Sequence, residues 1–268
     1  MTTPSTPPTG TDPDKSMRPR DAATLVIVDR VLGVPRVLMG QRRFDQVFMP
    51  GKYVFPGGRV DESDRAVESA DELHPVEVSK LLLDMKGHPS PVRARALGMA
   101  ALRETFEEAG VVIGAPASSS AETRCEAPSW NAFFACGYLP KLSSLRLFAR
   151  AITPPGRPRR YDTRFFHISA DEISHQVDTS DGELLGLHWL TIEDARSLDL
   201  PSITRVILED LTDFLRDGAS GSGDAPVPYY HHKNGIFRRD LLSVADASMQ
   251  LDTEGGQGMV RPISNERA

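Results

Sequence analysis

Cysteine is scarce in this sequence, and its scarcity excludes several kinds of site. The chain of 268 residues has two cysteines, Cys125 and Cys136, which lack the spacing of a metal-ligand motif and are too few for a disulfide framework. No apolar run approaches the ~20 residues that a transmembrane helix needs, and residues 1–20 lack the apolar core of a signal peptide. We therefore expect free thiols in a reducing compartment, a cytoplasmic location and no membrane partner.

An excess of basic charge is also missing. The formal net charge is −6, which gives no support to a role in coating nucleic acid, so we expect no nucleic-acid partner. Hydrophobic residues make up 40% of the chain and charged residues 25%, proportions that are typical of a soluble globular protein. The length fits one large domain, or one domain with extensions.

Composition divides the chain into three parts. Residues 1–20 are rich in Pro, Thr and Ser and are expected to be disordered. Residues 21–217 carry the periodic patterns of a folded domain. Residues 218–268 begin with the linker-like stretch GASGSGDAP and continue as a tail without sustained periodicity.

Strands and helices mix within residues 21–217. Gly33 separates two short apolar runs, which predicts a hairpin, and the strongest helical pattern covers residues 92–109. Because hairpins occur among the strands, the pattern favours an α/β domain with a mixed sheet over a regular βαβ winding. The predicted strands are Ala23–Asp29, Pro35–Arg42, Trp130–Leu139, Leu145–Ile152, Tyr161–Ile168 and Leu184–Leu190, and the later helices are Thr191–Leu198 and Ser202–Asp217.

Three carboxylates gather near the end of the 92–109 helix, where negative charge opposes the helix dipole. Glu104, Glu107 and Glu108 share one helix face, and like charges three or four residues apart repel by roughly 0.2–0.5 kcal/mol per pair. A hard divalent cation such as Mg²⁺ or Mn²⁺ takes oxygen ligands and would remove this repulsion. A solvated acidic patch is the alternative interpretation of the glutamates alone. Arg103, four residues before Glu107, is placed to pair with it.

A glycine turn precedes this helix in the sequence. Gly57 and Gly58 follow a short strand in the stretch FPGG. Glycine tolerates unusual dihedral angles and the close approach of other groups, so the backbone of this turn could face a metal ion or a diphosphate.

Together, the turn and the helix resemble the signature of the Nudix hydrolase family, G-x5-E-x7-R-E-U-x-E-E-x-G-U, where U is apolar. Residues 103–111, RETFEEAGV, match its second half except at Thr105, where the family usually has an apolar residue. Asp64 stands where the family has its first glutamate, and Arg103 follows it by 39 positions rather than eight. The resemblance therefore implies a Nudix-type α/β/α sandwich. Its signature, the Nudix box, would be split by a helical insertion at about residues 65–94.

A split box is similar to that of the Nudix branch that contains a coenzyme A diphosphatase with an insertion in its box. A coenzyme A signature of related enzymes matches in part between Leu38 and Asp61, where Arg42, Gly51 and FPGG agree and seven other positions do not. The resemblance implies hydrolysis of a nucleoside diphosphate linked to a moiety X, with coenzyme A or acyl-coenzyme A as the first candidate. ADP-ribose, NADH or a dinucleoside polyphosphate is the alternative, and a non-catalytic ligand-binding module is a third reading.

The resemblance also implies roles for single residues. Glu104, Glu107 and Glu108 would bind Mg²⁺ or Mn²⁺, and Glu183 is the candidate for a further ligand or base, with Asp178 and Asp181 as alternatives. A nucleotide-derived small molecule is the expected partner, and a homodimer is an open alternative because Nudix enzymes often dimerise. The candidates for substrate contact are Arg42, Arg43, Gly57, Gly58 and Arg164, followed by Arg159 and Arg160, with Phe44, Phe48 or Tyr161 for stacking on a base.

Overall fold

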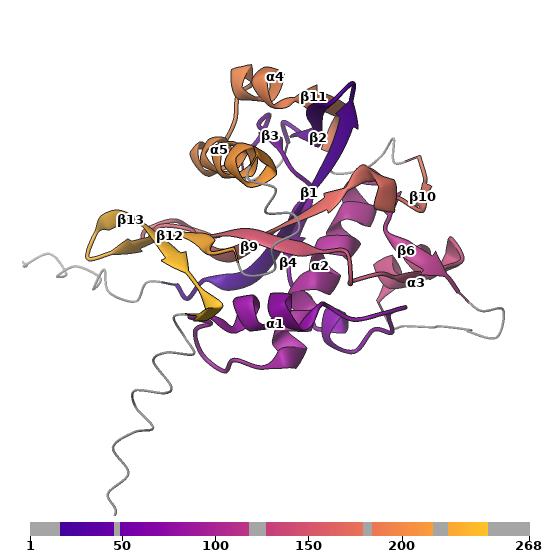
Figure 1. Cartoon of the computed structure of the whole chain (residues 1–268), viewed down its shortest axis with the longest axis horizontal. Helices are drawn as coiled ribbons and strands as arrows, with labels where there is room; N and C mark the ends of the chain where they lie inside the picture. Colours follow the sequence, from indigo (N-terminus) through magenta and orange to yellow (C-terminus); the bar gives the residue numbers. More distant parts are fainter. Residues whose placement is uncertain (1–16, 46–48, 118–126, 179–183, 217–224, 246–268) are drawn as a thin grey trace, which may run out of the picture.

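The computed structural model describes residues 17–45, 49–117, 127–178, 184–216 and 225–245 (Figure 1). Its centre is a nine-stranded sheet with the main strand order β11-β2-β1-β9-β8-β12-β13, in which β1 runs parallel to β9, β12 runs parallel to β8, and the other pairs are antiparallel. The strands are β1 (Arg20–Val31), β2 (Val34–Arg42), β8 (Arg146–Ile152), β9 (Tyr161–Ser169), β11 (Leu184–Thr191), β12 (Val227–Lys233) and β13 (Ile236–Leu242), and β3 (Tyr53–Val54) and β4 (Gly57–Arg59) add to β2 and β1. Two small sheets pair β5 (Val111–Val112) with β10 (His175–Gln176), and β6 (Gly114–Pro116) with β7 (Tyr138–Pro140).

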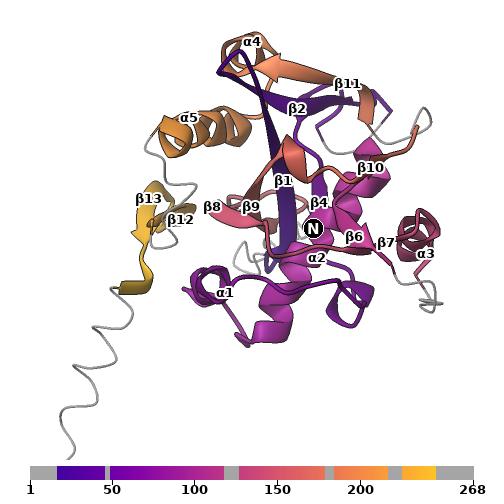
Figure 2. The same cartoon turned by 45° about the vertical axis from the view of Figure 1, so that its right-hand side comes forward.

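Helices cover both faces of the large sheet. On β1, Leu25 and Ile27 belong to one buried cluster, whereas Val26 and Val28 point to the other face and belong to a second. The helices α1 (Pro75–Leu82) and α2 (Pro91–Ala109) lie on the first face, and α4 (Ile192–Ser197) and α5 (Ser202–Arg216) lie on the second (Figures 1 and 2). The predicted α/β/α sandwich with a mixed sheet is confirmed. Within the described residues, no helix is both long and apolar enough to cross a bilayer.

The central helix α2 has clear signals at both ends. Ser90 is its N-cap and accepts a hydrogen bond from the backbone N–H of Arg93, and Pro91 occupies the first helical position. Gly110 ends the helix in the left-handed conformation, with φ of 65°. Thr105, which departs from the family pattern, is fully buried and donates its hydroxyl to the Ala101 carbonyl at 2.7 Å. The predicted helix over residues 92–109 is therefore confirmed.

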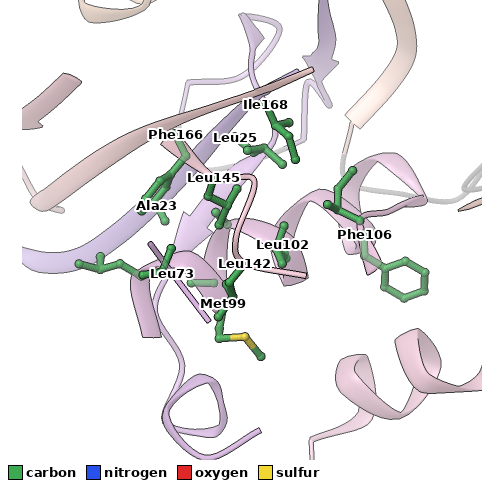
Figure 3. Packing of buried hydrophobic residues seen from close by; sticks show 14 of the residues in the cluster. Ala23, Leu25, Leu73, Met99, Leu102, Phe106, Leu142, Leu145, Phe166 and Ile168 are labelled. Carbon is green, nitrogen blue, oxygen red and sulfur yellow. The ribbon is translucent and has the colours of Figure 1, made fainter. Parts of the chain in front are cut away.

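The insertion within the box packs into the core of the first face. Leu73, Leu81 and Met85 are buried there with residues of α2, and Figure 3 shows Leu73 close to the side chains that fill the space between α2, β1 and β9. Its two ends meet, because the Arg95 guanidinium contacts the Glu72 carboxylate at 2.9 Å and the Ser69 hydroxyl at 2.6 Å. The insertion therefore begins and ends at nearly the same place in the folded structure.

The strand predicted over Trp130–Leu139 is wrong. Residues Pro128–Ala135 form the helix α3, and only Tyr138–Pro140 is extended, as β7. Pro128 at the first helical position favours a helix start, and Trp130 and Phe133, three residues apart, are both fully buried. Periodicity alone does not separate such a short aromatic run from a strand. The hairpin at Gly33 is confirmed, as are strands at β8, β9 and β11 and helices at α4 and α5.

The last hairpin lies beyond residue 217, where the sequence places the end of the domain. β12 pairs with β8 and β13 pairs with β12, so residues 227–242 are part of the large sheet. β12 buries Val227, Tyr229 and Tyr230. Asn234 and Gly235, both with positive φ, form the two-residue turn between the strands. This Asn-Gly pair is a strong local signal for a hairpin that a search for long periodic runs passes over.

Candidate functional site

A cavity of about 650 Å³ opens beside β4, between the second half of α2 and the start of α5. A volume of this size is typical of small-molecule sites. Its wall combines the glycine turn, the acidic end of α2, four arginines and the pocket-facing residues of β1 and β9. The main lining residues are Ala22, Thr24, Arg42, Gly57, Gly58, Arg59, Asp61, Arg103, Glu104, Glu107, Glu108, Arg159, Tyr161, Thr163, Phe165 and Thr204.

The glycine turn touches two of the three glutamates. The backbone N–H of Gly57 donates to Glu108 Oε2 at 2.9 Å. Gly58 lies so close to Glu104 that a Cβ added at Gly58 would be 2.5 Å from the Glu104 carboxylate carbon. A side chain at Gly58 would have to displace that carboxylate, so the glycine lets Glu104 keep its place against the turn. The turn and the helix, which the sequence separates, therefore form one wall of the cavity.

Arg103 joins the two halves of the split box. Its Nε and Nη2 donate to the two Asp64 carboxylate oxygens at 2.8 and 3.0 Å, a bidentate pair. Its Nη1 contacts Glu104 Oε1 at 2.9 Å and Glu107 Oε2 at 3.2 Å, and its Nη2 also donates to the Arg59 carbonyl at 2.8 Å. The expected pairing of Arg103 with Glu107 is confirmed, and Asp64 becomes its neighbour although 39 positions separate the two.

Trp130 is a member of this cluster that sequence reasoning missed. The indole Nε1–H donates to Asp64 Oδ1 at 3.0 Å, and both side chains are fully buried. The backbone N–H of Asp61 also donates to Asp64 Oδ2 at 2.7 Å. Counting along the box finds Asp64, but Trp130 lies on α3, well outside the box, and was predicted on a strand. No local signal in the sequence links it to Asp64.

Carboxylates outnumber guanidinium groups at this end of α2. Burial is the main cause that raises the pKa of Glu104 to about 7; Arg103 opposes this rise and the nearby Glu107 adds to it. Although burial opposes the charge of Arg103, its contacts with Asp64 and Glu104 raise the pKa of the guanidinium. Asp64, Glu104 and Glu107 therefore all contact one guanidinium group, that of Arg103.

The donor set suits a hard divalent cation, although the side chains do not yet form a closed ligand set. Across the described part of the chain, no three His, Cys, Asp or Glu side chains are arranged as a metal cluster. The reason is visible in the contacts: Glu104 and Glu107 turn to Arg103, and Glu108 turns to the Gly57 N–H. Clustered carboxylate oxygens beside a ligand-sized cavity are the chemistry that Mg²⁺ or Mn²⁺ prefers.

The predicted substrate residues fall in different places. Arg42 lines the cavity, and its Nη1 lies 3.8 Å from Glu108 Oε1, whereas Arg43 points to Asp45, with Nε 3.3 Å from the carboxylate. Arg164 is 1% exposed and pairs with Asp162 at 2.8 Å. Since Tyr161, Thr163 and Phe165 face the cavity, Arg164 points to the opposite face of β9, and we place no substrate contact on it.

Among the remaining candidates for substrate contact, some line the cavity and others do not. Arg159 and Tyr161 line the cavity, as does Arg59, which the sequence did not single out although it directly follows the glycine turn. Arg160 donates instead to the carbonyls of Thr153 and Met17. Phe44 is exposed and is not part of the wall. Three other candidates, Phe48, Asp181 and Glu183, lie outside the described residues.

The two glycines of the turn are expected to respond differently to alanine. In Gly57→Ala, the new Cβ would lie 2.5 Å from the Ala23 backbone oxygen, so β1 and β4 must move apart and we expect a loss of about 1–3 kcal/mol. In Gly58→Ala, the Cβ meets only the end of the Glu104 side chain, which can swing away, so we expect a loss below about 1 kcal/mol. Urea unfolding of both variants measures the difference. A larger loss for Gly58→Ala than for Gly57→Ala would contradict this geometry.

Known proteins resemble this chain over most of the region described. Residues 20–199 match the family described as NUDT19 Nudix domain. The chain is 27% identical to a Gallus gallus protein named acyl-coenzyme A diphosphatase NUDT19, over 59% of this chain and 54% of that protein. It is 26% identical to putative nudix hydrolase 7 of Caenorhabditis elegans, over 64% of this chain and 51% of that protein, so it spans about half the length of these curated relatives. The crystal structure of a NUDIX hydrolase from Alicyclobacillus acidocaldarius superposes with a TM-score of 0.50 and 27% identity, covering 72% of this chain and 90% of that one.

Proposed function

The chain belongs to the NUDT19 Nudix domain family, and on this premise we propose that it hydrolyses the diphosphate bond of a nucleoside diphosphate linked to a second moiety X. One observation carries the proposal. The two halves of the split box come together on the wall of a ligand-sized cavity, where Glu104 and Glu108 meet the glycine turn and Glu107 lies on the same wall. A module that only binds a ligand has no need of three clustered carboxylates held in place by an arginine.

We propose that Glu104, Glu107 and Glu108 hold Mg²⁺ or Mn²⁺ at this wall. Such an ion supplies positive charge against phosphate oxygens and acidifies a bound water. Exposure of the side chains suits this role, since Glu107 is 34% exposed and reachable from the cavity, while Glu104 and Glu108 are 14% and 4% exposed and firmly placed. Glu183 stays a proposal for a further ligand or base.

The arginines of the cavity are proposed to bind the diphosphate. Arg42, Arg59 and Arg159 line the wall on elements distant in the sequence, and guanidinium groups contact phosphate oxygens in pairs. The turn at Gly57 and Gly58 allows a phosphate to approach the backbone closely. Together these groups would orient the diphosphate beside the carboxylates, so that water adds to one phosphorus and the bridging oxygen leaves with the other phosphate.

Coenzyme A or an acyl-coenzyme A is the proposed substrate. Support comes from the name of the Gallus gallus relative, to which the chain is 27% identical, and from the partial coenzyme A signature at Leu38–Asp61. The same chemistry would also serve ADP-ribose, NADH or a dinucleoside polyphosphate.

The proposal is tested by a substrate panel with Mg²⁺ and Mn²⁺, in which products are identified by mass. Hydrolysis of coenzyme A should release 3′,5′-ADP and 4′-phosphopantetheine, and chelation of the metal should stop it. Release of AMP from ADP-ribose or NADH, with coenzyme A unchanged, would replace the proposed substrate. Failure to hydrolyse any member of the panel would favour the ligand-binding reading.

A further inference from the structure

The strand β13 forms one end of the large sheet. Along the described part of the chain it pairs with β12 on one edge, and no strand pairs with its other edge. Six of its seven residues, Ile236–Leu241, are exposed. An open edge presents unpaired backbone N–H and C=O groups and is a template for another strand.

Large apolar side chains stand at both ends of this exposed strand, beside the charged residues Arg238, Arg239 and Asp240. Ile236, Phe237 and Leu241 are 57%, 54% and 55% exposed. They are three of nine large hydrophobic side chains that are exposed within the described residues, and no other strand or helix has three. Charged residues can protect an open edge, but exposed apolar side chains on the same edge favour a partner that covers them.

The sequence of β13, IFRRDLL, is complementary to itself. When two copies run antiparallel about a two-fold axis at Arg239, Arg238 of each copy faces Asp240 of the other. In the same register Phe237 faces Leu241, and Ile236 faces Leu242. Cross-strand pairs of opposite charge and of apolar side chains both stabilise a sheet. We propose that β13 is a homodimer interface, in which two copies of this chain join their sheets through this register.

Arg239, the residue on the two-fold axis, does not prevent this register. Arg239 would face Arg239 of the second copy, but its guanidinium is already compensated within its own chain. Its Nε contacts the Tyr230 hydroxyl at 2.9 Å, and its Nη2 contacts Asp210 Oδ1 at 3.3 Å, on the face that α5 covers. Asp240 accepts from His231 Nε2 at 2.7 Å, which holds the carboxylate on the same face of the hairpin as Arg238. One pair of seven-residue strands buries little area, so the dimer should be reversible and depend on concentration.

Reversal of the charges tests the register. Arg238→Asp places two carboxylate pairs opposite each other, and we expect the dimer dissociation constant to rise by at least about tenfold. The double variant Arg238→Asp/Asp240→Arg restores opposite charges across the interface and should dimerise about as the wild type does. Arg43→Asp, an equal charge change at an exposed residue directly after β2, is the control and should leave dimerisation unchanged, since four strands of the sheet separate β2 from β13. Sedimentation velocity over a range of concentrations measures each variant.

A second measurement needs no variant. Amide hydrogen exchange of residues 236–242 in the wild-type protein should slow as protein concentration rises, because the open edge becomes paired. A wild type that is monomeric at every concentration would overturn the proposal. So would equal dimerisation by Arg238→Asp and the wild type, or a double variant that stays as monomeric as the single one.

Discussion

Replacing Arg103 with alanine is expected to lower the free energy of unfolding by about 3–5 kcal/mol, since removal of one partner from a buried ion pair leaves an uncompensated charge. Asp64 is fully buried and would lose both of its guanidinium contacts, and Glu104, whose pKa burial already raises to about 7, would lose the one cation that opposes that rise. Urea unfolding followed by circular dichroism measures the loss. A protein that unfolds at the same urea concentration as the wild type would contradict the role assigned to Arg103.

Two further variants allow the stability loss of Arg103→Ala to be compared with smaller expected losses. Arg196→Ala removes an ion pair with Glu209 that is largely exposed, so it should cost about 1 kcal/mol or less. Trp130→Phe keeps the aromatic packing against Phe133 but removes the N–H that Asp64 accepts, and it should cost about 1–3 kcal/mol. The order Arg103→Ala, Trp130→Phe, Arg196→Ala from largest to smallest follows from the contacts. Any other order would mean that the buried cluster is not what holds the box together.

Glu108→Gln is expected to lower kcat by at least about a hundredfold while the protein stays folded. The glutamine carbonyl can still accept from the Gly57 N–H, so the contact between turn and helix is kept, but one negative charge is lost from the proposed metal ligands. Turnover of the best substrate at saturating Mn²⁺ measures the change. Glu62→Gln is the matched control, since Glu62 is 89% exposed and does not line the cavity, and it should leave kcat unchanged. Unchanged turnover in Glu108→Gln would remove Glu108 from the site.

The insertion in the box is accommodated without disturbing the site. Its apolar side chains, such as Leu73 and Leu81, extend the core on the face of α2 that lies away from the cavity. Within it, Glu77 and Lys80 form a buried pair at 3.3 Å, and the second Glu77 oxygen accepts from the Leu147 N–H at 2.8 Å. Because Arg95 ties its two ends, the segment adds mass to the first face while Asp64 and Arg103 keep a short contact.

The sequence predicts those features that have local causes. The helix α2, the hairpin at Gly33 and the Arg103–Glu107 pair follow from residue types and spacing over a few positions. The same reasoning finds both halves of the box but not how they meet. That contact depends on Asp64 and Trp130, which come together only when the chain is folded, and on a helix, α3, whose aromatic residues favour strand and helix about equally.

Whether an arginine points into the cavity is another feature that the residue type alone does not reveal. Arg159 and Arg164 are both plausible phosphate ligands by residue type, yet only Arg159 lines the cavity. Arg159 lies in the loop before β9. Arg164 lies on β9, where side chains alternate, so the face that it takes depends on the register of β9 with β1 and β8. Sequence patterns give the residue type but leave that register open.

Where the two halves of the box meet at the cavity wall, we propose that Glu104, Glu107 and Glu108 hold a divalent ion. Calorimetric titration of Mn²⁺ into the wild type and into the triple variant Glu104→Gln/Glu107→Gln/Glu108→Gln tests it most directly. We expect the wild type to bind Mn²⁺ saturably, and we expect this binding to be lost in the triple variant while its circular dichroism shows it to be folded. Equal Mn²⁺ binding by the two proteins would show that these glutamates do not hold the ion.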